Sequence, residues 1–73
     1  MLLIMVNINK ELGKKIREIR KKKELTQEDL AYKAGLDYSY INQIENGKRN
    51  PSMEAVEKIA KALGVKVQAL VSF

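Results

Sequence analysis

The stretch TQEDLAYKAGLDYSYINQIENG, residues 26–47, contains two short helical patterns on either side of one glycine. Thr26 offers a hydroxyl that can cap a helix, and the acidic residues after it lie in the first turn, where the helix dipole favours them. Gly35 stands where a helix needs a residue of positive φ to end, and Asp37 can cap the next helix. The pattern predicts a helix, a turn of about three or four residues, and a second helix over about residues 38–46.

This second helix carries neutral polar side chains opposite its buried side. Ile41 and Ile44 mark the buried side, because successive helical residues advance by about 100°. Charged residues make up 32% of the chain, yet the opposite stripe has none. Lys and Glu are better helix formers than Ser and Asn, so solvation alone does not account for the choice. The members of this neutral stripe are Ser39, Asn42, Gln43 and Asn46.

Helical periodicity continues through most of the remaining chain. Residues 10–23 predict an amphipathic helix with Asn9 as its N-cap, and Gly13 in its first turn indicates close packing. A fourth helix is predicted to follow the cap residue Ser52 and to end at Gly64. Its inner face is predicted to consist of Met53, Val56, Ile59, Ala60 and Leu63. The following VKVQALV suits a short fifth helix, although its valines also suit a strand. We therefore expect an all-α domain with four long elements and one short one.

Composition narrows the function before any motif is used. The chain has 73 residues, enough for one small domain, and it has no cysteine and no histidine. Disulfides, thiol nucleophiles and the usual transition-metal ligands are therefore excluded, and a reducing cytoplasm is favoured. The net charge of +5 favours a polyanionic partner. Residues 10–23 hold eight basic and two acidic side chains, a local +6, which also fits an ordinary solvated helix face.

The chain begins with an apolar run, MLLIMV. Six residues are far fewer than the about 20 that span a bilayer, and no basic segment or cleavage site marks a signal peptide, so no membrane segment is predicted. We expect residues 1–9 to form an apolar N-terminal arm and residues 10–73 to form the domain. The arm either packs on the domain or on a partner subunit, or is an accidental extension with Met5 as the natural start.

The whole pattern resembles a known family. LTQEDLA, the turn at Gly35 and INQIENGKRNPS follow one another as they do in the Cro and lambda-repressor type of helix-turn-helix domain, the XRE family. The resemblance covers about residues 12–65. It implies a compact five-helix lambda-repressor-like DNA-binding domain, with the helix-turn-helix formed by the second and third helices. Within the family, the length and TQEDLAYKAGLD resemble the small controller proteins of restriction-modification systems.

The resemblance implies that the third helix enters the major groove. Gln and Asn can pair with adenine through two hydrogen bonds, Ser can bond to several bases, and Tyr can touch a thymine methyl or the backbone. A neutral amide matches one pattern of base-edge groups and rejects others, whereas a Lys would bind phosphate anywhere. Gln43 is the strongest candidate. The positions that approach base edges are Tyr38, Ser39, Asn42 and Gln43.

Other positions match family residues that hold the DNA backbone, which fixes register without reading sequence. Gln27 also braces the third helix in the family. Tyr40 fits equally a packing role against the second helix, with only its hydroxyl at a phosphate. Asn46 also fits a helix C-cap. The phosphate-binding set is Gln27, Tyr40, Asn46, Lys48 and Arg49. Glu45 matches a family Glu that pairs with an Arg of the first helix, here Arg20, so we assign both to a structural ion pair.

The apolar chain ends suggest a homodimer, because they exceed what one small domain easily covers. The predicted interface is Val67, Leu70, Val71 and Phe73, with Leu2, Leu3 and Ile4 as further candidates; alternatively, these residues complete the monomer's own core. A dimer also suits the function, because a single recognition helix contacts few base pairs and two-fold dimers read half-sites about 34 Å apart.

The sequence therefore predicts a transcriptional regulator that binds double-stranded DNA as a homodimer on a two-fold operator. The alternative is a protein-interaction module with the same fold, such as an antitoxin half or a coactivator-like bridging domain. No nucleophile, base or metal set meets catalytic geometry, so no enzyme and no cofactor is predicted. The short chain leaves no space for a sensing domain, so no small-molecule effector is implied.

Overall fold

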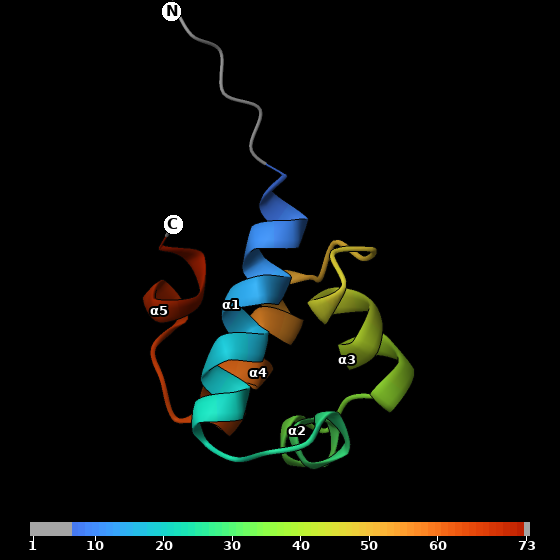
Figure 1. The fold of residues 1–73 in the computed structure, drawn as a ribbon, viewed down its shortest axis with the longest axis vertical. Helices are drawn as coiled ribbons and strands as arrows, with labels where there is room; N and C mark the ends of the chain where they lie inside the picture. The colour runs from blue at the N-terminus through green and yellow to red at the C-terminus, as the bar shows by residue number, and fades with distance from the viewer. Residues whose placement is uncertain (1–6, 73) are drawn as a thin grey trace, which may run out of the picture.

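The computed structural model describes residues 7–72, and within this range the chain forms five α-helices. Figure 1 shows α1 upright at the centre with α4 behind it, α2 and α3 on one side, and α5 on the other. The all-α prediction is confirmed, and the valine-rich last segment is a helix rather than a strand. The elements are α1 (Ile8–Lys22), α2 (Gln27–Ala34), α3 (Tyr38–Glu45), α4 (Met53–Leu63) and α5 (Val67–Val71).

Most helix ends follow the local signals in the sequence. At the start of α2, Thr26 and Asp29 form a capping box in which each side chain accepts a hydrogen bond from the other residue's backbone N–H. Gly35 ends α2 with a φ of 68°, a conformation that costs glycine little. The Ser52 hydroxyl caps α4 by accepting from the backbone N–H of Ala55 at 3.1 Å. These caps satisfy backbone groups that would otherwise lack partners.

Two predicted caps differ from the structure. The prediction of Asn9 as N-cap of α1 is wrong, because Asn7 caps the helix and its Oδ1 accepts from Lys10 N at 3.0 Å. The earlier asparagine gives a longer helix, with a further bond from Glu11 N to Asn7 O at 3.0 Å. Asp37 does hold the N-cap position of α3, but its side chain makes no capping hydrogen bond. The predicted N-terminal arm lies mostly in residues 1–6, outside the described residues.

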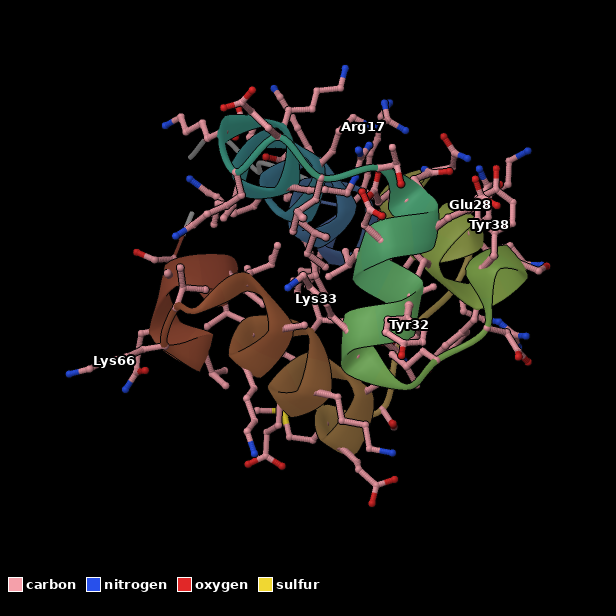
Figure 2. The ribbon with its side chains drawn as sticks, turned by 90° about the horizontal axis from the view of Figure 1, so that it is seen from below. Arg17, Glu28, Tyr32, Lys33, Tyr38 and Lys66 are labelled. Atoms are coloured by element: carbon pink, nitrogen blue, oxygen red, sulfur yellow. The ribbon has the colours of Figure 1, made fainter. Side chains whose placement is uncertain are left out.

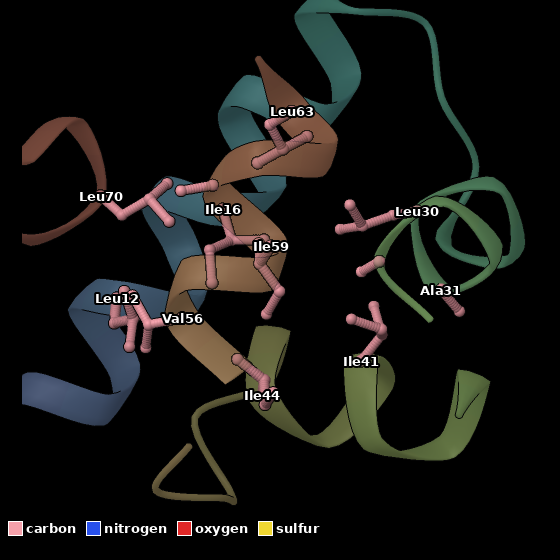
Figure 3. Close-up of a cluster of buried hydrophobic side chains, with 12 residues drawn as sticks. Leu12, Ile16, Leu30, Ala31, Ile41, Ile44, Val56, Ile59, Leu63 and Leu70 are labelled. Carbon is pink, nitrogen blue, oxygen red and sulfur yellow. The ribbon is translucent and has the colours of Figure 1, made fainter. Parts of the chain in front are cut away.

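The core lies where all five helices meet, as Figure 3 shows. α1 packs against α3 and α5, and α4 packs against α2 and α5. Met53, predicted on the inner face of α4, is 63% exposed, because it is the first residue of that helix and extends past the core. The largest fully buried side chains are Ile16, Leu30, Ile41, Ile44, Ile59, Leu63 and Leu70.

Candidate nucleic-acid interface

The α2–turn–α3 unit presents one side of α3 to solvent. Leu36 N donates to Ala31 O at 2.9 Å and Gly35 N donates to Tyr32 O at 3.2 Å, so the turn satisfies the last carbonyls of α2. Ile41 and Ile44 are 0% and 1% exposed and hold α3 on the core. The opposite side of α3 is consequently available to a ligand.

The exposed side of α3 is made of few side chains with few internal bonds. Tyr38 is 52% exposed, Ser39 is exposed, and Gln43 is partly exposed. Gln43 Nε2 donates to Ser39 Oγ at 3.2 Å, a bond between residues one helical turn apart. Within residues 7–72 this is the one side-chain hydrogen bond that Ser39 and Gln43 make. Their remaining side-chain donors and acceptors make no hydrogen bond within residues 7–72. We name Tyr38, Ser39 and Gln43 the reading face.

Asn42, also predicted to read bases, is partly exposed, but both ends of its amide are bonded to other residues of the protein. Its Nδ2 donates to Gln27 Oε1 at 3.1 Å, and its Oδ1 accepts from Asn46 Nδ2 at 3.3 Å. Gln27, predicted to bind phosphate, in turn donates through Nε2 to Glu45 Oε1 at 3.0 Å. Both ends of both amides are therefore used internally. The bracing role that the resemblance implied for Gln27 is visible as this bridge from α2 to α3.

The ion pair between Arg20 and Glu45 is present and buried. Arg20 Nε donates to Glu45 Oε2 at 2.7 Å and Arg20 Nη2 donates to Oε1 at 3.0 Å, a two-point contact between α1 and the end of α3. The two side chains are 9% and 0% exposed. Arg20 Nη1 also donates to Leu25 O at 2.7 Å, which ties the α1–α2 turn to the same group. No buried side-chain nitrogen or oxygen within residues 7–72 lacks a partner.

Arg17 joins this network, although the sequence analysis did not single it out. Its Nε donates to Glu45 Oε1 at 3.3 Å, and its Nη2 donates to Asn46 Oδ1 at 2.9 Å. Arg17 lies three residues before Arg20, so the two guanidinium groups leave α1 on neighbouring sides. That spacing is the signal that could have found it. We name Arg17, Arg20, Gln27, Asn42, Glu45 and Asn46 the anchor network.

The anchor network sets the charge of Glu45. Burial by itself raises the pKa of this carboxyl. Hydrogen bonds from Arg20, Gln27 and Arg17 and the positive charge of Arg20 lower the pKa, and together they outweigh burial. The pKa of Glu45 therefore lies below its ordinary value. Glu45 is therefore ionised near neutral pH. The last turn of α3 has no basic residue of its own, so the cations of α1 also lie at the negative end of the α3 dipole.

A glycine lets α1 approach α3 closely enough for these bonds. A Cβ added at Gly13 would lie against Ile44 O and 2.7 Å from Glu45 O, both backbone atoms. Any side chain at this position would push the last turn of α3 away. The close packing predicted for Gly13 is confirmed, and the contact places Arg17 and Arg20 within reach of Glu45.

The loop between α3 and α4 carries residues that the sequence predicts to bind phosphates of the DNA backbone. Asn46, Lys48 and Arg49 are exposed. Tyr40 is half-buried beneath this loop: the Arg49 guanidinium lies 5.3 Å from the centre of its ring, and its hydroxyl accepts from Ser52 N at 3.4 Å. Tyr40 thus organises the loop, which fits the packing alternative. Neither Lys48 nor Arg49 forms a salt bridge within residues 7–72.

The predicted dimer residues divide into different environments. Leu70 is 0% exposed and completes the monomer's core, so it does not form a dimer surface, and the prediction for this residue is wrong. Val67 packs partly against the same core, whereas Val71 is 45% exposed. Phe73 and the candidates Leu2, Leu3 and Ile4 lie outside the described residues.

Within residues 7–72 no group of three or more acidic residues is placed to hold a metal ion. The helices in the same range are too short or too polar to cross a membrane.

Comparisons with known proteins agree with this geometry. The helix-turn-helix family model matches residues 16–70. The control protein C.BamHI of Bacillus amyloliquefaciens is 46% identical over 68 residues, covering 92% of this chain and 84% of that protein. The solved restriction-modification controller protein C.AhdI from Aeromonas hydrophila has a TM-score of 0.84 at 40% identity, covering 85% of this chain and 94% of its own. The controller protein C.Esp1396I, solved as a tetramer with its natural 35 base-pair operator, has a TM-score of 0.79 at 40% identity, covering 85% and 82%.

Proposed function

This chain belongs to the helix-turn-helix family, and from that premise we propose that it is a transcriptional regulator that binds double-stranded DNA in a sequence-specific manner. The observation that carries the proposal is the reading face: neutral hydrogen-bonding side chains are exposed on a helix whose other side is fixed to α1 and α2. A helix that is fixed in place and carries polar groups without intramolecular partners can enter the major groove without rearranging the protein. The similarity to restriction-modification control proteins supports this assignment.

Within this function the residues take three roles. The reading face contacts base edges, and Gln43 contributes most because its amide can both donate and accept. Lys48 and Arg49 hold phosphates on one side of α3, and Tyr40 holds Arg49 in place. Gln27, Asn42 and Asn46 position α3, and any contact that they make with DNA is made by groups already held in the anchor network.

The regulator acts as a homodimer in the cytoplasm, by binding alone and without catalysis or a small-molecule effector. One reading face contacts few base pairs, and a two-fold dimer doubles the contact over half-sites about 34 Å apart. The exposed Val71 and the partly exposed Val67 on α5 are the described residues on which we place the dimer contact. Dimerisation then makes operator occupancy depend on protein concentration.

Selection of bound duplexes from a random DNA pool tests the function directly. We expect enrichment of one motif with two-fold symmetry and half-sites separated by about one helical turn. An enriched motif without symmetry would contradict the homodimer, which sedimentation over a concentration range would check independently. Absence of any enriched motif would contradict sequence-specific binding and favour the protein-interaction alternative.

A further inference from the structure

Four of the seven basic side chains of α1 lie on one side of that helix. Lys10, Lys14, Arg17 and Lys21 are separated by four, three and four residues, so at about 100° per residue they lie within about 60° of one another. The acidic residues of α1, Glu11 and Glu18, fall about 70–90° from the centre of this group. We name the four basic residues the α1 stripe. They span about 16 Å of helix, enough to meet several successive phosphates.

The α1 stripe is continuous with the loop that follows α3. Arg17 donates to Asn46 Oδ1 at 2.9 Å, and a Cβ at Gly47 would lie 2.8 Å from Lys10 Cα, so the loop that carries Lys48 rests directly on the stripe. A hollow of about 560 Å³ between α1 and the end of α3 is lined by Lys10, Glu11, Lys14, Arg17, Glu45 and Asn46. Figure 2 shows Arg17 projecting from α1 on the side where α2 begins, while Lys66 projects beyond α5.

Most of this charge is not used within the protein. Arg17 is paired with Glu45, and its side chain remains 40% exposed. Within residues 7–72 the lysines of the stripe form no salt bridge with a carboxylate, and all three are exposed. Three unpaired cations beside a paired arginine therefore keep a positive surface next to the phosphate-binding loop.

We propose that the α1 stripe binds the sugar-phosphate backbone that flanks the half-site entered by α3. This inference rests on the proposed function and adds to it a second row of phosphate contacts, beside that of Lys48 and Arg49. The ligand is the phosphodiester chain of a duplex and the contact reads no base. The stripe therefore raises affinity for all duplexes equally and steepens the dependence of binding on salt, because each phosphate neutralised releases a counterion.

The test compares two double variants. Lys10→Gln with Lys14→Gln removes charge from the stripe and leaves Arg17 in its ion pair. Lys58→Gln with Lys61→Gln removes equal charge from exposed positions of α4, beside a separate hollow that they line with Lys33. Binding is measured by fluorescence anisotropy over a salt series, on the duplex selected from a random pool and on a scrambled duplex of equal length. Thermal melts check that both variants remain folded.

We expect the stripe variant to lower the slope of log affinity against log salt by about 2 for each bound subunit, on both duplexes, with the affinity ratio between the duplexes unchanged. The α4 variant should keep the wild-type slope. An unchanged slope in the stripe variant, an equal fall in both variants, or a loss confined to the selected duplex would each overturn the proposal. Failure of the wild type to prefer the selected duplex would instead overturn the proposed function, and the scrambled duplex would still test the stripe.

Discussion

Two neighbouring amides on α3, Asn42 and Gln43, have different hydrogen-bond partners. Asn42 uses both ends of its amide inside the protein, on Gln27 and Asn46, whereas Gln43 makes one hydrogen bond to Ser39 and otherwise faces solvent. Their side chains leave the helix about 100° apart, and that rotation separates the anchor network from the reading face. The residue type alone does not decide the role of a polar side chain at this surface; the partners within its reach do.

The two regions also differ in what their loss should affect. The anchor network lies between three helices and contains a buried charge pair, so damage to it should appear in the stability of the fold. The reading face contributes little to folding, because its groups are hydrated with or without the native structure. Substitutions in the two regions should therefore separate effects on stability from effects on DNA binding.

Arg20→Met should destabilise the fold by roughly 3–5 kcal/mol, because it leaves the buried carboxylate of Glu45 without its main partner and frees Leu25 O as well. Urea unfolding gives the free energy of unfolding. Arg17→Met is the matched control and should cost less, since Arg17 is 40% exposed. In a double-mutant cycle with Glu45→Gln, additive losses would show that Arg20 and Glu45 are not coupled.

Gly13→Ala should destabilise the fold by roughly 1–3 kcal/mol, because the added Cβ meets backbone carbonyls of α3 that cannot turn aside. In an exposed helix the same change would stabilise by about 1 kcal/mol. The sign of the shift in thermal midpoint therefore distinguishes contact from propensity. A rise would mean that α1 and α3 can separate without cost, contrary to a rigid anchor.

The anchor network should also give stability a dependence on pH. The pKa of Glu45 is lowered in the folded protein, so its contribution is fully present above its ordinary value of 4.5 and is lost as pH falls through the lowered folded value. Thermal melts near neutral pH and at about pH 3 should show a smaller loss on acidification for Glu45→Gln than for the wild type. Equal losses would indicate that Glu45 keeps an ordinary pKa when folded.

The smallest effect concerns a turn outside both regions. Glu24, between α1 and α2, has a φ of 58°, which is costly for a residue with a Cβ. Glu24→Gly should stabilise the fold by roughly 1 kcal/mol or less, since relief of strain is partly offset by a more flexible unfolded chain. Glu24→Gln removes only the charge. An equal gain in both variants would attribute the effect to charge at the end of α1 rather than to backbone strain.

Local signals in the sequence predicted most of the fold. The caps at Thr26 and Ser52, the turn at Gly35 and the buried spacing of Ile41 and Ile44 each depend on neighbours within a few residues, and the structure has all of them. Asn7 and Asn9 show the limit of such signals. Both can cap a helix, and the order of the residues does not rank them.

The sequence could not show which polar side chains of α3 are bonded within the protein, because that depends on distances between helices. A helical wheel places Asn42 at the edge of the exposed side, but only the position of α2 shows that Gln27 is within 3.1 Å of it. An apolar residue near a chain end fits either a partner subunit or the core, and the sequence alone does not decide which applies to Leu70. The family resemblance predicts the pair of Arg20 and Glu45. The spacing of Arg17 and Arg20 indicates that they leave α1 on neighbouring sides, but the contact of Arg17 with Glu45 also depends on how α1 is rotated against α3.

If Gln43 reads a base while the loop after α3 holds phosphate, substitutions at the two positions should weaken DNA binding in different ways. Gln43→Ala and Lys48→Ala are titrated over a salt series on the selected duplex and on a scrambled one. Gln43→Ala should weaken binding to the selected duplex by roughly 1–3 kcal/mol per half-site and leave the scrambled duplex nearly unchanged, whereas Lys48→Ala should weaken both and lower the salt slope by about 1 per contact. Equal losses on both duplexes for Gln43→Ala would contradict base reading by the reading face.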